Sequence, residues 1–269
     1  MSETTGPAGA DATSYYRDLG EGRFESTLHA QGAWDPNEQH MAPVTGIMVR
    51  ALLHFQPRPD MRLVRINFDI LGQIPGGEFS LETTVLRPGR TIELIQCELT
   101  AAGRVAVRAT AWRLQTSDTS AVAALEDKHM PPLEAAHPWD GMLGWPGGFI
   151  ASIEARIIDG HRAGRGKVWI HSPLEMVAGE PTEPMVRLLG LADSSNGIAF
   201  RVRPGHGSYM FPNVDLSLHL YREPEGAWLG LDNSVTFADD GVGLTSTVLH
   251  DVRGPFGRAE QILTVRAVS

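Results

Sequence analysis

Three polar residues in the second half of the chain have types and positions suited to chemistry on water. The first is Asp193, which shares one face of a predicted helix with Val186 and Leu189, seven and four residues earlier. A carboxylate on an apolar face costs free energy unless it is hydrogen-bonded or does chemistry. Desolvation would raise its pKa, which suits a general base that takes a proton from water. The alternative is an Asp near a helix end that bonds to neighbouring Ser and Asn side chains or faces solvent.

Gln261 and Asn213 are the other two polar candidates. Gln261 lies between Ala259 and Leu263 in a strand pattern, so its amide points with the apolar set and needs a hydrogen-bond partner. Asn213 follows Pro212 at the predicted start of another strand. Taken alone, Gln261 fits a satisfied core amide and Asn213 fits a turn residue. The chemistry therefore depends on whether the fold brings the three together.

A repeated pattern gives these residues more weight. Residues 65–71 and 215–221 begin two similar runs of four strands, offset by roughly 150 residues, as expected for two similar subdomains. When the copies are superimposed, Leu63 falls opposite Asn213 and Val107 falls opposite Gln261. The first copy is apolar where the second is polar, which predicts that the chemistry resides in the second half.

Each half contains one apolar helix followed by antiparallel strands. The helices are expected over 44–55 and 184–199, since proline ends the first and both are apolar nearly all round. A curved sheet wrapped around one central helix satisfies that order in each half. Strands bounded by Pro and Gly turns are expected over 24–30, 63–71, 78–86, 91–100, 105–114, 149–158 and 166–172, with four more from Asn213 onward.

The composition divides the chain into four parts. Residues 1–13 are small, polar and acidic without an apolar run, which indicates a disordered tail rather than a signal peptide. Residues 14–117 form the first repeat and 149–269 the second. Residues 118–148 are rich in Ser, Ala, Pro and Trp, and we expect them to be a surface linker with its tryptophans packed inward.

Charge and cysteine content exclude several classes of protein. The net charge of -9, with no long basic run, argues against nucleic acid or anionic membrane as partners. The single cysteine, Cys97, excludes an internal disulfide framework and favours the cytoplasm. No apolar stretch approaches the ~18 residues of a membrane span. We also find no G-x-S-x-G motif and no Cys/His cluster, which argues against a serine hydrolase and a metal site.

The second half resembles a known family. The segments MVRLLGLAD (185–193), NVDLS (213–217) and AEQILTVR (259–266), together with the duplication, are similar to the acyl-CoA thioesterase II family. The resemblance extends from about Phe24 to Arg266. It implies an α+β double hotdog, in which two hotdog repeats each wrap an antiparallel sheet around a central helix.

The resemblance also implies a reaction. In the family an Asp, a Thr or Ser and a Gln hold the water that attacks an acyl-CoA thioester, and Asp193 and Gln261 match two of these positions. Asn213 stands where the family has its hydroxyl residue, and an amide cannot act as a hydroxyl does. The implied activity is hydrolysis of acyl-CoA to a carboxylic acid and free CoA, with no cofactor or metal. A homodimer is compatible with the resemblance.

Two other functions remain open at this stage. The Asn213 substitution favours a non-catalytic protein that binds acyl groups or acyl-CoA. Asp215 and His219 lie four residues apart on one strand face, and an enoyl-CoA hydratase of the hotdog class pairs such residues. For the CoA anion, the candidate cationic groups are Arg87, Arg90 and the basic segment 161–167.

Overall fold

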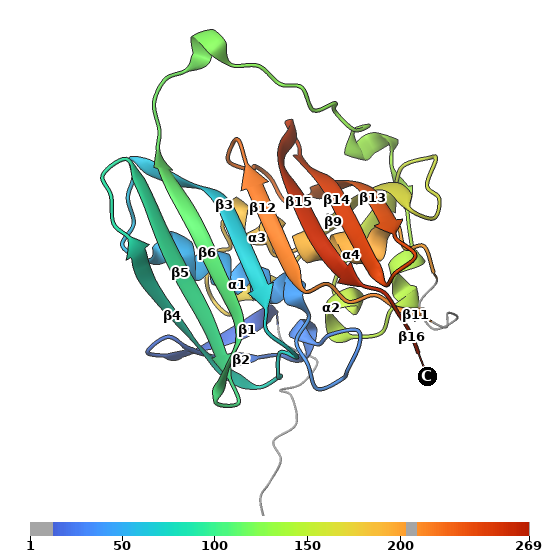
Figure 1. Cartoon of the computed structure of the whole chain (residues 1–269), viewed down its shortest axis with the longest axis horizontal. Coiled ribbons are helices and arrows are strands. Elements are labelled where there is room, and N and C mark those ends of the chain that lie inside the picture. Colours follow the sequence, from blue (N-terminus) through green and yellow to red (C-terminus); the bar gives the residue numbers. More distant parts are fainter. Residues whose placement is uncertain (1–12, 203–208, 269) are drawn as a thin grey trace, which may run out of the picture.

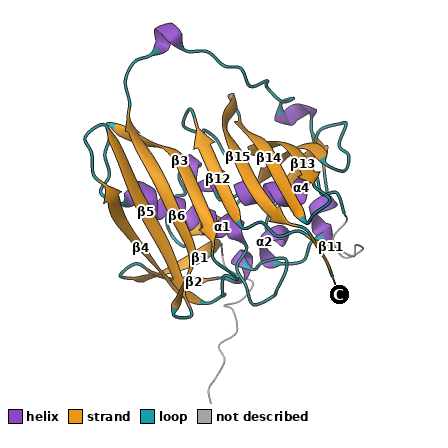
Figure 2. Ribbon diagram, viewed as in Figure 1, coloured by secondary structure: helices purple, strands orange, loops and turns teal. Residues whose placement is uncertain are grey.

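Strands dominate the computed structural model, which describes residues 13–202 and 209–268. Within these ranges, fourteen strands form one sheet in the order β10-β1-β2-β4-β5-β6-β3-β12-β15-β14-β13-β9-β8-β7, and β11 pairs with β16. Helices lie behind the sheet, on the side away from the viewer (Figures 1 and 2). The first-half strands are β1 (Ser14–Gly20), β2 (Arg23–Ser26), β3 (Met61–Ile70), β4 (Glu78–Arg87), β5 (Ile92–Ala101) and β6 (Arg104–Gln115).

The second half repeats this plan. Its strands are β8 (Glu154–Ile157), β9 (Arg165–His171), β10 (Glu175–Val177), β12 (Asp215–Leu220), β13 (Leu229–Phe237), β14 (Val242–Asp251) and β15 (Gly254–Thr264). Short strands β7 (His137–Pro138), β11 (Tyr209–Met210) and β16 (Arg266–Ala267) complete the set. The helices are α1 (Met41–His54), α2 (Gly148–Ala151), α3 (Pro184–Leu189) and α4 (Ser195–Ile198), with 3-10 turns at Leu28–Ala30, Ser120–Val122, Leu133–Ala135, Gly141–Gly144 and Ala192–Ser194.

The two halves meet edge to edge around an approximate two-fold axis. β3 and β12 pair antiparallel, with Asn67 opposite Ser217, and the Ser217 hydroxyl donates a hydrogen bond to the Asn67 side-chain oxygen. These two residues are 150 apart in sequence. The same offset relates the other ladders, since Ser80↔Thr100 in the first half corresponds to Gly230↔His250 in the second. The repeat inferred from the sequence is therefore also seen in strand pairing, because residues 150 apart occupy equivalent positions in the two sets of strands.

The register corrects one detail of the sequence alignment. Thr110 pairs with Asn67 as Glu260 pairs with Ser217, so the counterpart of Gln261 is Ala111 rather than Val107. Ala111 is fully buried. The contrast between a polar second half and an apolar first half is unchanged, because both candidates in the first half are apolar.

The helix α1 and the helical segment of the second half cross at Gly46 and Gly190, and the second helical segment is interrupted at this point. A Cβ atom on Gly190 would stand 2.8 Å from the Val186 carbonyl oxygen and 3.2 Å from the Gly46 Cα atom. The segment predicted as one helix over 184–199 is instead α3, then the 3-10 turn Ala192–Ser194, then α4. The pattern had the right apolar face, but Gly190 ends the first piece where it meets α1.

Two predicted strands also differ from the structure. The strand expected over 24–30 is the short β2 followed by a 3-10 turn, and β1 before it was not predicted. The strand expected over 149–158 begins as helix α2. At the start of α2 the backbone packs closely at Gly148, where a Cβ atom would lie 1.8 Å from the Leu28 carbonyl oxygen.

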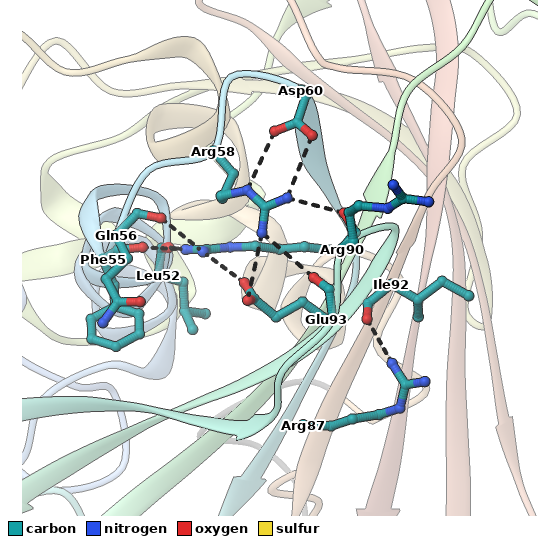
Figure 3. A network of polar contacts seen from close by, with 11 residues as sticks. Leu52, Phe55, Gln56, Arg58, Asp60, Arg87, Arg90, Ile92 and Glu93 are labelled. Atoms are coloured by element: carbon teal, nitrogen blue, oxygen red, sulfur yellow. Dashed lines mark hydrogen bonds and ion pairs between the residues drawn. The ribbon is translucent and has the colours of Figure 1, made fainter.

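The C-terminal end of α1 lies in a network of polar contacts around Leu52, Phe55, Gln56 and Glu93 (Figure 3). Arg113, 4% exposed, donates to the carbonyl oxygens of Leu52, Phe55 and Gln56 and forms an ion pair with Glu93 at 3.2 Å. These bonds satisfy carbonyls that a helix end leaves without partners and place positive charge there. The network holds α1 from the end opposite the one that reaches the cavity described below.

The segment between the halves arches over one end of the sheet (Figure 1). Residues 114–126 are exposed, whereas Met130, Met142 and Trp145 are buried. The Trp169 indole N–H donates to the Pro131 carbonyl oxygen at 3.1 Å, which fastens the second part of the segment to the sheet. None of the described helices is both long enough and apolar enough to span a bilayer.

Candidate active site

Asp193, Asn213 and Gln261 come together beside two cavities. Asp193 lies in the 3-10 turn between α3 and α4, Asn213 precedes β12 and pairs with Leu263 of β15, and Gln261 lies on β15. The larger cavity has a volume of about 480 Å³, and Asp193 and Asn213 are in its wall. The smaller cavity has a volume of about 40 Å³ and shares these two residues with the first.

The two amides converge on one oxygen of the Asp193 carboxylate. The Asn213 side-chain N–H and the Gln261 side-chain N–H each donate to Asp193 Oδ1 at 2.8 Å. Asp193 is 5% exposed and Gln261 is fully buried. Because Oδ1 holds both amides, Oδ2 is the oxygen that remains for a proton transfer.

Burial and hydrogen bonding shift the pKa of Asp193 in opposite directions. Desolvation raises it, the bonds from Asn213 and Gln261 lower it, and the result is a pKa of about 6 against an ordinary value of 3.8. At neutral pH the carboxylate is mostly ionised, and it is a stronger base than an exposed Asp.

His40 is a site residue that the sequence analysis missed. It caps α1, where its Nδ1 accepts a hydrogen bond from the Ala42 backbone N–H at 3.0 Å, and the same atom lies 3.7 Å from Asp193 Oδ2. Burial lowers the pKa of His40 to about 3, so the ring is neutral and its proton is on Nε2. The ring packs on Phe149 and lines both cavities. In the sequence, only the position of His40 directly before an apolar helix could have indicated that it is a site residue.

Aromatic residues build the rest of the wall. Trp34 contacts Trp145 and Phe211 edge-on, with ring centroids 4.9 and 5.9 Å apart. Trp145 comes from the segment between the halves, so both halves and the connection between them contribute to the site. Asn196 of α4 donates to the Phe211 carbonyl oxygen at 3.0 Å and ties this wall to the Asp193 segment.

The other predicted candidates lie elsewhere. Asp215 accepts a hydrogen bond from the Ile262 N–H at 2.7 Å, and His219 is exposed on the same outer strand face, so this pair does not reach the cavities. Arg87 donates to a main-chain carbonyl in its own turn. Arg165 and Lys167 of the basic segment pair with Asp232. Arg90, likewise, is in neither cavity wall.

One basic residue does line the larger cavity, and the single cysteine does not. Arg266, on β16, is the arginine in that wall among the described residues. Cys97 is buried within β5, and burial raises the pKa of its thiol to about 12, so it is unreactive. No group of three His, Cys, Asp or Glu side chains within the described ranges is arranged to hold a metal ion.

Comparison with known families gives this site its context. A family model described as the acyl-CoA thioesterase C-terminal domain matches residues 116–265, and one described as the N-terminal domain matches residues 30–114. The chain belongs to the acyl-CoA thioesterase family. This thioesterase is accordingly a thioester hydrolase that acts on acyl-CoA. No curated protein sequence matches it.

Solved structures show the same fold at low sequence identity. A proposed thioesterase II from Thermobifida fusca YX has 19% identity and a TM-score of 0.71, covering 94% of the thioesterase and 96% of that chain. A hot dog protein of unknown function from Alicyclobacillus acidocaldarius has 14% identity and a TM-score of 0.73, covering 96% and 98%. An acyl-CoA thioesterase II from Mycobacterium marinum has 15% identity and a TM-score of 0.63, covering 94% and 96%. The thioesterase therefore has a hotdog fold.

Proposed function

We propose that this thioesterase hydrolyses acyl-CoA with a water molecule activated by Asp193. The observation that carries the proposal is the convergence of Asn213 and Gln261 on one oxygen of a buried carboxylate whose pKa is raised to about 6. A base with that pKa is ionised at neutral pH and still takes a proton from water in the transition state. Oδ2 is the accepting atom, because Oδ1 is already bonded twice.

The proposed steps balance without a cofactor. Asp193 Oδ2 takes a proton from water while the water oxygen attacks the thioester carbonyl carbon, and the carbonyl oxygen becomes an oxyanion. The oxyanion then collapses, the carbon–sulfur bond breaks, and the CoA thiolate leaves. The proton held by Asp193 passes to that thiolate, which yields a carboxylic acid and CoA thiol.

The N-terminus of α1 is the proposed oxyanion site. Among the first residues of α1, the Ala42 N–H already donates to His40 and Pro43 has no N–H, which leaves the Met41 N–H. Met41 lines the larger cavity beside Asp193. A backbone N–H at the start of a 14-residue helix favours developing negative charge.

Asn213 takes the place of the family hydroxyl in this scheme. Its N–H holds the carboxylate, and its side-chain carbonyl can accept a hydrogen bond from the attacking water. Gln261 is fully buried and in neither cavity wall, so its part in the scheme is the N–H that holds Asp193 Oδ1. These observations favour catalysis over the non-catalytic alternative, because a purely structural Asp would not need a free oxygen.

A direct assay tests the function and the role of Asp193. Purified protein is mixed with acyl-CoA of two to sixteen carbons, and free thiol is measured. We expect turnover on at least one substrate and a loss of kcat of about 100-fold or more in Asp193→Ala. Turnover unchanged by Asp193→Ala would contradict the assigned base, and thiol release at the blank rate throughout would contradict hydrolysis.

We also infer a double hotdog with repeats over 14–117 and 149–269 and a linker over 118–148. The constant 150-residue register supports this division. The tail over residues 1–13 lies almost entirely outside the described residues. A cytoplasmic location and a homodimer stay predictions of the sequence.

A further inference from the structure

The turn that carries Asp193 is held from outside by a side chain of the sheet. Helix α4 packs against β13 and β14, behind the sheet in Figure 1, and Asn233 lies fully buried on β13. The Asn233 side-chain N–H donates a hydrogen bond to the backbone carbonyl oxygen of Ser195. Ser195 is the first residue of α4 and comes two residues after Asp193. The bond therefore fixes the backbone on the C-terminal side of Asp193, as the packing of Gly190 on α1 fixes it on the other side.

Thr247 is the second member of this buried anchor. It lies directly opposite Asn233 in the β13–β14 ladder, is 2% exposed, and donates its hydroxyl proton to the Asn233 side-chain oxygen at 2.6 Å. A backbone carbonyl only accepts hydrogen bonds, so the amide nitrogen must face Ser195 and the amide oxygen must face Thr247. Both ends of the amide are thereby paired, which gives the anchor a single arrangement.

Further hydrogen bonds make Ser195 and Asp193 parts of one unit. The Ser195 hydroxyl donates to the Ala192 carbonyl oxygen at 2.8 Å, across the 3-10 turn that contains Asp193. The Gln261 side-chain N–H donates to Asp193 Oδ1 and also contacts the Asp193 backbone carbonyl oxygen at 3.4 Å. A shift of the Ser195 carbonyl would therefore move the turn, and with it the carboxylate relative to the amides that bond to it.

The equivalent pair in the first half has no such amide. Thr83 and Cys97 lie opposite each other in the β4–β5 ladder, 150 residues before Asn233 and Thr247, and α1 packs on these strands. Helix α1 is unbroken over 14 residues, so most of its backbone groups pair within the helix. The pieces of the broken segment have six, three and four residues and leave more of their backbone groups to outside partners. The amide is thus present in the half whose helix is interrupted.

We propose that Asn233 and Thr247 are positioning residues that hold the Asp193 carboxylate against its two amide donors. The proposal rests on the proposed function, because it takes Asp193 as the base. Neither residue is in the wall of the two cavities beside Asp193, so both act through the turn rather than on the substrate. They should therefore affect kcat and the protonation of Asp193 more than the binding of acyl-CoA.

Two substitutions of Thr247 separate the hydrogen bond from packing. Thr247→Val removes the hydroxyl and keeps the shape, whereas Thr247→Ser keeps the hydroxyl and loses a methyl group. The first change leaves the Asn233 oxygen without its donor, so kcat should fall about tenfold with KM within about twofold of the parent. The second should keep kcat within about twofold. A residue needed only for packing would give the opposite order.

Asn233→Leu removes both hydrogen bonds of the anchor at once. It should lower kcat at least as much as Thr247→Val, and a failure of this variant to fold leaves the decision to Thr247→Val, which changes the side-chain volume little. Cys97→Ala is the matched control, because Cys97 is the fully buried counterpart of Thr247 in the first half. It should lower the midpoint of urea unfolding and keep kcat within about twofold of the parent.

The titration of Asp193 gives a readout that a merely structural role would not move. The two amide bonds lower the pKa of Asp193, so their weakening in Thr247→Val or Asn233→Leu should raise that pKa and move the acidic limb of kcat/KM to higher pH. His40 is the ionisable side chain that faces Asp193 among the described residues, and burial keeps it neutral by lowering its pKa to about 3. An NMR titration of the Asp193 carboxyl carbon measures the same shift without substrate.

The outcomes distinguish this inference from the proposed function. Folded Thr247→Val protein with kcat within about twofold of the parent and an unmoved Asp193 titration overturns the positioning role and leaves the mechanism standing. A fall in kcat with an unmoved titration overturns it as well, since the effect then does not pass through Asp193. Absence of turnover in the parent overturns the proposed function and with it the role in hydrolysis, whereas the NMR titration still decides whether Asn233 and Thr247 hold the carboxylate.

Discussion

Asp193 is held by two amide donors inside a wall that otherwise disfavours its charge. Either influence alone would move its pKa away from the useful range, upward by burial or downward by hydrogen bonds. The balance at about 6 makes its protonation state sensitive to conditions close to neutral pH. Three predictions follow from that balance.

The first concerns the pH dependence of hydrolysis. A general base acts only when deprotonated, so kcat/KM should rise about tenfold per pH unit below pH 6 and level off above about pH 7. His40 should add no second step between pH 5 and 8, since burial keeps its pKa near 3. Measurement of kcat/KM from pH 4.5 to 8.5 checks this, and a flat profile would rule out Asp193 as the base.

The second concerns stability. The pKa of Asp193 is higher in the folded state than in the unfolded chain, so the folded state loses stability as pH rises from about 4 to 6. At pH 7 the cost is about 3 kcal/mol. Asp193→Asn can still accept both amide N–H groups, so it should raise the free energy of unfolding by up to that amount at pH 7 while it abolishes activity.

Urea unfolding at two pH values measures this effect. The difference between Asp193→Asn and the parent should shrink toward zero at pH 4, where the parent carboxyl is protonated in the folded state. A variant that is less stable than the parent at pH 7 would contradict the sign of the shift.

The third concerns Asn213. Its N–H lowers the pKa of Asp193, so Asn213→Leu should move the acidic limb of the pH profile to higher pH and reduce kcat. Asn213→Ser retains a donor and should stay closer to the parent profile. The pH profiles of the parent and the two variants provide the comparison. An acidic limb at the parent position in both variants would show that Asn213 does not set the pKa of Asp193.

Sequence reasoning reached Asp193 and Gln261 because each interrupts an apolar period, and it reached Asn213 through the repeat and the family resemblance. Asp193 and Gln261 fall on inward faces that the 3.6- and 2-residue periods define. His40 interrupts no such period, since it lies outside the helix that it caps, and nothing in its neighbours points to Asp193. Its role depends on how two distant helices meet, which local patterns do not encode.

At the scale of elements, the crossing of α1 and α3 positions the base. Gly46 and Gly190 let the helix backbones approach closely, and the chain turns immediately afterwards to present Asp193. The four long strands of each half could be predicted because Pro and Gly turns bound them. The break after Gly190 could not, because it follows from contact with a helix about 140 residues earlier in the chain.

That crossing predicts a large effect from a small substitution. Gly190→Ala places a methyl group 2.8 Å from a carbonyl oxygen, which should lower the free energy of unfolding by about 1–3 kcal/mol and reduce kcat by displacing Asp193. Gly197→Ala is the matched control, since its Cβ meets only ordinary contacts and stability should change by about 0.5 kcal/mol or less. Urea unfolding of both variants checks this, and equal stabilities would contradict the crossing argument.

At the scale of the whole molecule, the halves are joined by far more than the linker. β3 and β12 pair along their edges, and the site takes His40 from one half and Asp193 from the other. Residues 117–126, after the end of β6, are exposed, whereas Met130 and Trp145 further along the segment are buried.

A cut in the exposed stretch should therefore be tolerated. A protease site inserted after Val122 and cleaved in the folded protein should leave both pieces together on gel filtration, with kcat/KM within about twofold of the uncut protein. The same insertion after Leu143, between Met142 and Trp145 of the smaller cavity, should reduce activity strongly. Separation of the pieces after the first cut would show that the sheet edge does not hold the halves.

The shared register also bears on why polar residues occupy only one of two equivalent sets of positions. Symmetry offers two equivalent positions for polar side chains, yet Leu63 and Ala111 occupy the first-half counterparts of Asn213 and Gln261 and are buried. In a pair of identical subunits, equivalent positions always carry the same residue, so one cannot be polar while the other is apolar. A single chain with two copies is free of that constraint, so it holds apolar Leu63 and Ala111 in one half and polar Asn213 and Gln261 at the equivalent positions of the other.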